Sequence, residues 1–247
     1  MKFAVFLCIS LQLYVANSKS LTDLLRPCRK SDPNLNSCVL NLFQRGITIL
    51  AKGAPEYFIP PMDPFVIPVF EKNITIANLA EGNIVLKHVK ISNILNVKVS
   101  NVKIDLDNHQ GEIDLYHPQI KVSLQYSGDG KLFDTSMHSE GLFKGKFNDI
   151  KCNIKLKLKP IEKRGVKYFA LEDFKLNTHV GGGYIDIVAN DPEQQPIIDF
   201  VQNLFNQDPR PYLDVFNPII VETAESHIRK LLGGILAFVP ANAILPD

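Results

Sequence analysis

Apolar and polar side chains alternate along nearly every segment from about Ile74 to Ala189. A period of two places successive side chains on opposite faces of a strand, so that one face of the sheet is apolar and the other is solvated. In segment 151–160 the even positions from Cys152 to Leu158 are apolar, and lysine occupies most of the odd ones. We therefore predict a long antiparallel sheet over this part of the chain.

Two local features interrupt the alternation. Between Val99 and Val102 the apolar positions change from odd to even numbers, as one additional residue in a strand would produce, and this predicts a β-bulge near Asn101. The triplet at 181–183 is Gly-Gly-Gly, but no Lys-Ser/Thr follows it and the next residues alternate as a strand. We interpret this triplet as a turn or bulge, and not as a phosphate-binding loop.

A helix is predicted before the sheet. Asp32 is suited to the N-cap and Pro33 to the first helical position, and apolar residues then recur at helical spacing as far as Gly53 and Pro55. The following stretch, 59–68, contains too many prolines for a helix or for an interior strand. We expect it to be extended and held in place by packing.

Helical spacing returns after Pro192, first in 197–205 and then from Tyr212 towards Phe238, with a break at 208–211. In the second run the apolar residues cover more than one narrow stripe, so this helix must be enclosed. A long helix of this kind, preceded by a sheet with one apolar face, favours a sheet that curls around the helix. The predicted fold class is α+β, in a single domain over residues 19–247.

Residues 1–18 are predicted to be a secretory signal peptide. Lys2 precedes an apolar run from Phe3 to Ala16, and small residues follow as far as Ser18. The run is shorter than the ~20 residues that cross a bilayer, and no later segment is long and uncharged enough to do so. We expect a secreted, extracellular protein without a transmembrane segment.

The cysteines are interpreted in the light of the predicted export, because secreted proteins form disulfides. Cys8 lies in the signal, and Cys28 and Cys38 flank a turn-prone stretch, so we predict a disulfide between these two. Cys152 shares an apolar strand face and is predicted to be a buried, unreactive thiol. The sequon Asn73-Ile74-Thr75 is the predicted glycosylation site.

Charge and motifs exclude several classes of function. The chain has 27 Lys and Arg against 26 Asp and Glu, a formal net charge of +1, which disfavours a nucleic-acid partner. The sequence contains no Gly-x-Ser-x-Gly, no His-Glu-x-x-His and no paired-cysteine metal spacing, and its six histidines are scattered. We expect no enzymatic activity, no metal site and no cofactor.

Several motifs together resemble one known family. The pair Cys28 and Cys38 is followed by the block Pro-Glu-Tyr-Phe-Ile-Pro-Pro-Met-Asp-Pro-Phe at 55–65, and the likeness continues through Gly82, segment 118–130, Gly141 and Pro218. These features resemble the insect juvenile-hormone-binding and takeout family, and the single N-terminal cysteine pair is closer to its takeout branch. The resemblance implies a curled sheet around a long helix, with an elongated hydrophobic tunnel beside the helix. It also implies carriage of a juvenile hormone-like terpenoid, a fatty acid or another lipid, linked in some members to feeding or circadian physiology.

On this basis we predict a reversible carrier that takes a small hydrophobic ligand into the tunnel. Tyr126 shares the parity of neighbouring apolar residues of its strand, and its hydroxyl is predicted either to orient the ligand or to bond to backbone in a filled core. The candidate ligand-binding residues are Phe43, Ile47, Phe65, Tyr126, Phe133, Met137, Phe143, Phe216, Ile220, Leu231 and Ile235.

Two other functions stay open. An extracellular protein that binds anionic lipid or lipopolysaccharide surfaces would use Lys155, Lys157 and Lys159, although lysines on alternate positions are also what the solvated face of a strand requires. A protein that acts through a receptor surface, or through transient contact with a membrane, would have a fully packed interior.

Overall fold

The computed structural model describes residues 26–51, 53, 60–76, 80–132 and 135–247. The predicted signal peptide at 1–18, residues 55–59 of the proline-rich block and the candidate Phe133 lie outside the described residues. The described elements are α3 (Leu35–Leu50), β1 (Phe65–Ile76), β2 (Ala80–Ser92), β3 (Lys98–Asp105), β4 (Gln110–Leu132), β5 (Thr135–Lys163), β6 (Val166–Ala189), α4 (Gln195–Gln207), α5 (Arg210–Phe238) and α6 (Ala241–Ile244).

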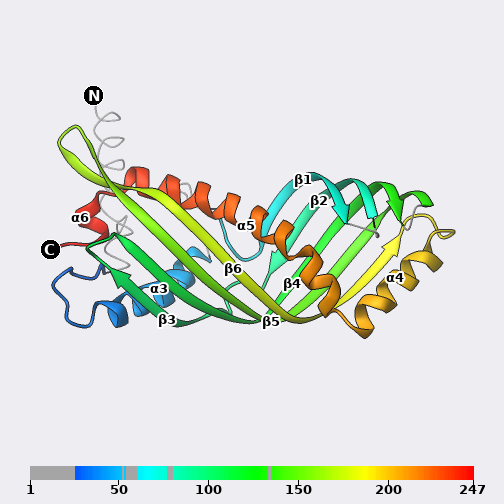
Figure 1. Cartoon of the computed structure of the whole chain (residues 1–247), viewed down its shortest axis with the longest axis horizontal. Helices are drawn as coiled ribbons and strands as arrows, with labels where there is room; N and C mark the ends of the chain where they lie inside the picture. The colour runs from blue at the N-terminus through cyan, green and yellow to red at the C-terminus, as the bar shows by residue number, and fades with distance from the viewer. Residues whose placement is uncertain (1–25, 52, 54–59, 77–79, 133–134) are drawn as a thin grey trace, which may run out of the picture.

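The strands form one antiparallel sheet in the order β1-β2-β4-β5-β6, with β3 paired to β4. Strands β4, β5 and β6 run most of the length of the molecule, with α3 and α6 at one end, α4 at the other and α5 lying along β6 (Figure 1). We refer below to the α3 end and the α4 end. The sheet begins at Phe65, earlier than predicted, because the proline-rich segment joins it as the terminal strand β1, where Pro68 is tolerated.

The curl of the sheet follows from the contacts of α5. In a flat sheet β1 and β6 would lie four strand spacings apart, about 19 Å, which exceeds the ~10–12 Å diameter of a helix. Nevertheless α5 contacts both strands: Lys72 of β1 forms an ion pair with Glu222, and Glu225 accepts a hydrogen bond from the backbone N–H of Leu176 on β6 at 2.6 Å. The rings of Phe65 on β1 and His227 on α5 are 6.1 Å apart. The sheet must therefore bend until both of its terminal strands reach one helix, as predicted from the wide apolar surface of that helix.

Irregularities at one level of three neighbouring strands contribute to this bend. The inward positions change parity between His117 and Ile120 in β4, between Phe147 and Ile150 in β5, and between Val180 and Gly183 in β6. One extra outward residue in each strand bends the sheet locally. The Gly181–Gly183 triplet lies at this irregularity inside β6, where a Cβ added to Gly181 would be 2.7 Å from the Cβ of Asp149.

Glycines allow the close approach of strands at the α4 end. Gly82 and Gly130 are direct cross-strand partners, and a Cβ on Gly130 would lie 2.1 Å from the carbonyl oxygen of Glu81. A Cβ on Gly141 would lie 2.0 Å from the carbonyl oxygen of Val188. Real Cβ contacts do not reach such distances, so only glycine fits the strand spacing found here.

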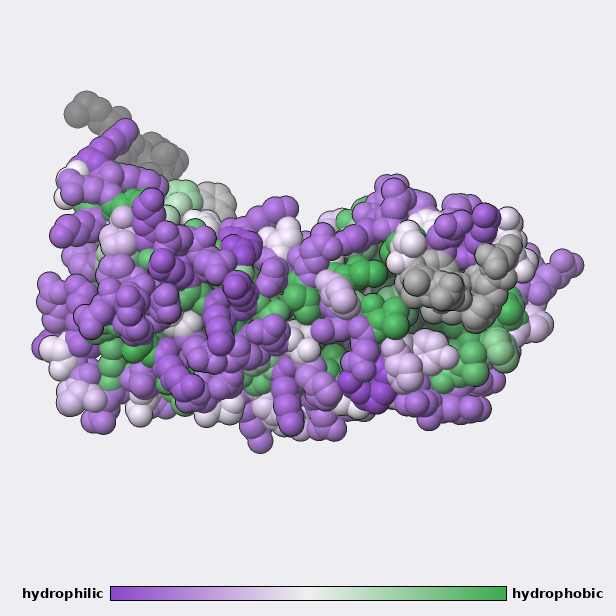
Figure 2. Space-filling model, viewed as in Figure 1, coloured by the Kyte–Doolittle hydropathy of each residue, from purple (hydrophilic) through white to green (hydrophobic). Residues whose placement is uncertain are grey.

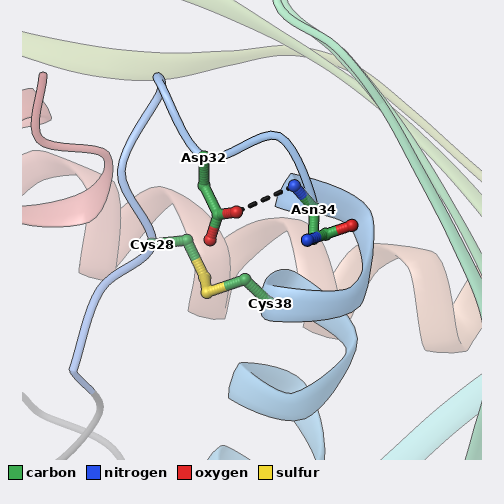
Figure 3. The surroundings of a disulfide bond; sticks show 4 residues. All are labelled: Cys28, Asp32, Asn34 and Cys38. Carbon is green, nitrogen blue, oxygen red and sulfur yellow. Dashed lines mark hydrogen bonds between the residues drawn. A yellow bond between two sulfur atoms is a disulfide. The ribbon is translucent and has the colours of Figure 1, made fainter.

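The predicted bulge and disulfide are both confirmed. The register of β3 against β4 shifts between Val99 and Asn101. Cys28 and Cys38 form a disulfide, which joins the segment before α3 to the first turns of the helix (Figure 3). The disulfide lies beside an apolar cluster in which Val39 of α3 packs on Val99 and Val102 of β3.

The start of α3 differs from the prediction. The helix begins at Leu35, with Asn34 as its N-cap, and not at Asp32. The Asp32 carboxylate instead accepts a hydrogen bond from the backbone N–H of Asn34 at 2.8 Å, so it orders the turn that precedes the helix (Figure 3). An aspartate that bonds two residues onward favours a local turn over a cap at its own position.

Side chains of α4 and α5 cover the outer edge of β6. Gln195, Gln202 and Asn206 accept hydrogen bonds from the backbone N–H groups of Ala189, Ile187 and Ile185 at 2.6–2.8 Å. Glu225 of α5 accepts one from Leu176, and Arg210 and Arg229 donate to backbone carbonyls of β6. An exposed strand edge would otherwise offer these groups to other chains. The two helices are thus fixed to the sheet by directional bonds.

This edge predicts a measurable difference between two asparagines of α4. Asn206 both accepts from the N–H of Ile185 and donates to its carbonyl, so Asn206→Ala leaves two covered backbone groups unpaired. We expect a loss of about 1–3 kcal/mol in the free energy of unfolding, or roughly 3–10 °C in Tm. Asn203→Ala, an exposed position of the same helix, is the control and should change Tm little. Equal Tm values for the two variants would contradict the bonding role of Asn206.

Candidate functional site

The face of the sheet that points towards α4 and α5 can be traced from the register. Ile185 faces the helices, because it packs against Phe205 of α4 and Leu213 of α5. Direct cross-strand partners share a face. The row of cross-strand partners that contains Ile185 also contains Gly145, Val122, Ile91 and Phe65, so all of these residues face inward. The neighbouring row through Ile187 contains Phe143 and Leu124, and the next contains Tyr126, Leu86 and Phe70.

This inward face is largely apolar, and several of its side chains remain partly accessible to solvent. At the α3 end Ile113 and Ile150 are buried and Leu115 and Ile154 are half-buried, and towards the α4 end Ile185 is buried. Towards the α4 end Ile120, Val122 and Leu124 of β4 are only half-buried, as are Phe70 and Leu86. We call this part of the concave face, together with the opposing side of α5, the groove.

One face of α5 closes the groove opposite the sheet. Leu213, Phe216, Ile220, His227 and Leu231 recur at spacings of three, four and seven residues and therefore share one side of the helix. Leu213 packs on the inward sheet cluster and His227 packs on Phe65, so this side faces the sheet. Between them Phe216 is 36% exposed and Ile220 is 49% exposed. Figure 2 shows hydrophobic residues at the surface between α5 and strands β1 and β2.

Few polar groups lie on the inward face. The hydroxyl of Tyr126 is 3.2 Å from Oγ of Ser139, a buried residue on the neighbouring strand β5. His117 is buried, its Nε2 lies 3.1 Å from the carbonyl oxygen of Ile94, and its Nδ1 has no partner among the described residues. The ammonium of Lys72 reaches Glu222 of α5, and the hydroxyl of Thr178 donates to Oδ1 of Asn217 on α5 at 2.5 Å.

The structure brings some of the predicted ligand-binding residues to the groove. Phe65 and Tyr126 occupy inward positions of the sheet, Phe216 and Ile220 face them from α5, and Met137 shares the cross-strand row of Gly130. Leu231 and Ile235 are half-buried in the last turns of α5. That these residues bind a ligand stays a prediction.

Other predicted residues pack in clusters or lie elsewhere. Ile47 packs against the α3–β3 cluster and Phe143 packs against the cluster around Ile185, and both are half-buried. That they bind a ligand also stays a prediction. Phe43 is on α3 and is exposed.

Two hollows occur outside the predicted lining. One of about 500 Å³ is bordered by β3 to β6 around Cys152, with Asp114, Lys151 and Asn153 among its residues. The other, of about 350 Å³, lies between the C-terminal part of α5 and β6, next to Arg229 and Gly233. Neither is lined by a candidate ligand-binding residue. Cys152 is a free thiol, and burial raises its pKa to about 11, which makes a reactive thiolate scarce at neutral pH.

The lysines proposed for an anionic surface are partly neutralised. Lys155 lies 3.8 Å from a carboxylate oxygen of Glu112, and Lys157 lies 3.0 Å from one of Glu172. In the part of the chain that the structure describes, no group of three or more His, Cys, Asp or Glu side chains could hold a metal ion. No helix there combines the length and apolarity needed to cross a membrane.

Comparison with known protein families shows to which family the chain belongs. The profile described as haemolymph juvenile hormone binding protein matches residues 3–246, nearly the whole sequence. The chain belongs to this family. It is a family of binding proteins, in agreement with the predicted resemblance and with the absence of hydrolase and zinc motifs from the sequence.

Individual family members are distant in sequence. The circadian clock-controlled protein daywake of Drosophila melanogaster is 21% identical over 198 residues, which cover 77% of this chain and 75% of that protein. The crystal structure of Takeout 1 from Epiphyas postvittana superposes with a TM-score of 0.74 at 20% identity, over 90% of this chain and 99% of the other. This likeness confirms the predicted fold class, a curled antiparallel sheet with a long C-terminal helix. A crystal structure of lipopolysaccharide binding protein gives a TM-score of 0.36, too low to carry an argument.

Among the polar groups of the inward face that the sequence analysis missed are Lys72, His117, Ser139 and Thr178. His117 and Ser139 carry a signal, because they share the parity of Leu115 and Phe143 in their strands. Lys72 shares the parity of Phe70 and Ile74, but the predicted sheet began only at Ile74, so this position was not assigned to a strand.

Proposed function

We propose that the protein is a secreted carrier that binds one small, elongated hydrophobic molecule in the groove, without a covalent step. One observation carries the proposal: the inward face is apolar, yet Phe216 and Ile220 on the opposing side of α5 are 36% and 49% exposed. A finished core would bury such side chains, whereas an apolar ligand would cover them. Membership in a family of binding proteins supports the same conclusion.

The energetics are sufficient for a carrier. Each buried methylene-sized group contributes about 0.8 kcal/mol of favourable binding free energy, so a fifteen-carbon chain contributes roughly 12 kcal/mol. Association and ordering of the ligand oppose this by several kcal/mol, which leaves a Kd in the micromolar to nanomolar range. Few polar contacts are then needed, in keeping with the few polar groups on the inward face.

Binding at two ionic strengths tests the proposal against the anionic-surface alternative. An environment-sensitive apolar dye is bound to the protein and displaced by terpenoids, fatty acids and quinones in low and high salt. Burial in the groove predicts displacement by at least one class with little effect of salt. Binding to anionic vesicles that disappears in high salt, without displacement of the dye by any of these molecules, would instead support a charged surface function.

Secretion is the second part of the proposal. It is supported by the disulfide, which oxidising compartments favour, and by the predicted signal peptide at 1–18. We propose that Asn73 is glycosylated on this route, since it is exposed on β1 with Thr75 two residues on. Protein secreted from insect cells should lose apparent mass on treatment with an N-glycosidase, and Asn73→Gln should remove the difference. Secretion without a change in mass would contradict the glycosylation, and retention in the cell would contradict export.

A role under circadian control is also a proposal. It is supported by the name of the Drosophila relative, a circadian clock-controlled protein. It predicts a daily rhythm in the abundance of this protein that persists in constant darkness, and a constant level would contradict it.

A further inference from the structure

Five lysines gather on the outward face of the sheet, towards the α4 end. Successive residues of a strand point to opposite faces, so the residues beside the inward positions Gly145, Val122 and Ile91 point outward. Three adjacent rows of this outer face place lysines on β2, β4 and β5, and all five are exposed. We call them the basic patch: Lys87, Lys90, Lys121, Lys144 and Lys146.

The protein does not neutralise the charge of the basic patch. Among the described residues none of the five lysines has an ion-pair partner, and Asp186 is the one carboxylate in the same three rows. Lys121 and Lys146 are direct cross-strand partners, which destabilises a sheet because like charges repel. On the same face at the α3 end, by contrast, Glu112 lies opposite Lys155 at 3.8 Å. A solvated face requires polar side chains but no unbalanced charge, so the basic patch needs another explanation.

Exposed apolar side chains border the basic patch. Leu142 and Val188 are direct cross-strand partners in the row of Lys87, and they are 48% and 51% exposed. Tyr184, also exposed, lies opposite Lys146. Lysines beside exposed aliphatic and aromatic side chains are the combination that binds an anionic membrane, because the cations meet the headgroups and the apolar groups enter the layer beneath them.

The position of the basic patch suits a flat partner. In the strand order β1-β2-β4-β5-β6 its lysines lie on the three middle strands. The sheet curls around α5, so its outer face is convex and the middle strands protrude. The next row towards the α4 end contains Glu71 and Glu140, which bound the positive area on that side. A membrane surface can therefore reach all five lysines without a cavity in the protein.

We propose that the basic patch is a docking surface for a membrane that contains anionic phospholipid. The lysines pair with lipid phosphates and carboxylates, while Leu142, Val188 and Tyr184 enter the headgroup region. Charge complementarity selects an anionic partner, and the apolar border favours a membrane over a soluble polyanion, which offers these side chains no apolar surroundings. This docking function stands beside the proposed carrier function and does not depend on what the groove binds.

The test is co-sedimentation of the full secreted chain with phosphatidylcholine vesicles, with and without about one-third phosphatidylserine. The wild type should bind the anionic vesicles at least about tenfold more tightly than the neutral ones, and high salt should abolish this preference. Lys144→Gln combined with Lys146→Gln should weaken binding to anionic vesicles roughly 25-fold, because each lysine near such a surface contributes about fivefold. Lys155→Gln combined with Lys157→Gln is the matched control, since these exposed lysines lie on the same face of β5 outside the basic patch, and it should change binding less than about threefold.

Leu142→Ser combined with Val188→Ser distinguishes a membrane from a soluble polyanion. It should weaken binding to anionic vesicles at least about threefold and leave binding to heparin, a sulfated polysaccharide, unchanged. A wild type that binds both kinds of vesicle equally would overturn the proposal, and so would equal losses in the two lysine double variants. Vesicle binding that does not respond to the serine substitutions would instead assign the basic patch to a soluble polyanion. All of these results leave the carrier function intact.

Discussion

Gly141→Ala is expected to destabilise the protein by roughly 3 kcal/mol or more, although it adds a single methyl group. The new Cβ would lie 2.0 Å from the carbonyl oxygen of Val188 and 3.0 Å from the Cα of Ala189. Both atoms belong to backbone of the paired strand, which cannot move without breaking the ladder between β5 and β6. Thermal unfolding should show a Tm lower by roughly 6–12 °C for a domain of this size.

The control is Gly182→Ala, in the same sheet on β6. A Cβ at that position meets no atom within 4 Å, so Tm should stay within about 3 °C of the wild type or rise slightly. Similar Tm values for the two variants would show that the strands at Gly141 can separate. The tight curl at the α4 end would then not depend on glycine.

Ile220→Trp should weaken binding of a hydrophobic ligand at least tenfold while Tm changes by only a few degrees. Ile220 faces the sheet from α5 and is 49% exposed, so an indole ring there would occupy ligand space without displacing packed protein. Because the chain contains no tryptophan, this variant also carries a single intrinsic fluorophore. Its emission reports directly whether residue 220 lies in an apolar site.

Val215→Trp is the matched control for Ile220→Trp, because both residues are on α5 and are similarly exposed. Val215 is 46% exposed and lies about 140° around α5 from Ile220. Its tryptophan should remain in water, should not respond to ligand and should leave affinity unchanged. Equal affinity in both variants would place the ligand elsewhere, and equal loss would indicate a general effect on α5.

Much of the fold is encoded in local patterns of the sequence. The alternation in 151–160 predicted inward Ile154 and Leu156, and the change of parity near Asn101 predicted the bulge in β3. The apolar breadth of the last helix predicted a sheet that curls around it, and α5 does contact both terminal strands. The helix is not fully enclosed, because Phe216, Ile220 and Phe238 stay exposed. Each of these features depends on neighbours within a few residues.

Long-range partners could not be predicted in this way. Gln195, Gln202 and Asn206 recur at helical spacing, but only the structure shows that their partners are the unpaired N–H groups of β6. The ligand site is predicted to include Phe143 and Ile47 because they are apolar; the structure packs both against protein clusters, which leaves their contact with a ligand a prediction. Composition does not distinguish a side chain that fills a core from one that lines a cavity.

Lys72 shows why part of the site was missed. It shares the parity of Phe70 and Ile74, but the predicted sheet began only at Ile74, after the proline-rich stretch 59–68 that was expected not to form an interior strand. Since β1 is the terminal strand of the sheet, the missing N–H of proline is tolerated there, and the strand extends through Lys72 to Ile76.

Native mass spectrometry of protein secreted from insect cells, followed by organic extraction of whatever it releases, tests the carrier function most directly. We expect one apolar molecule per chain, lost when the protein is unfolded. Protein that arrives without an adduct, and that binds no terpenoid, fatty acid or quinone when these are added, would contradict the carrier function.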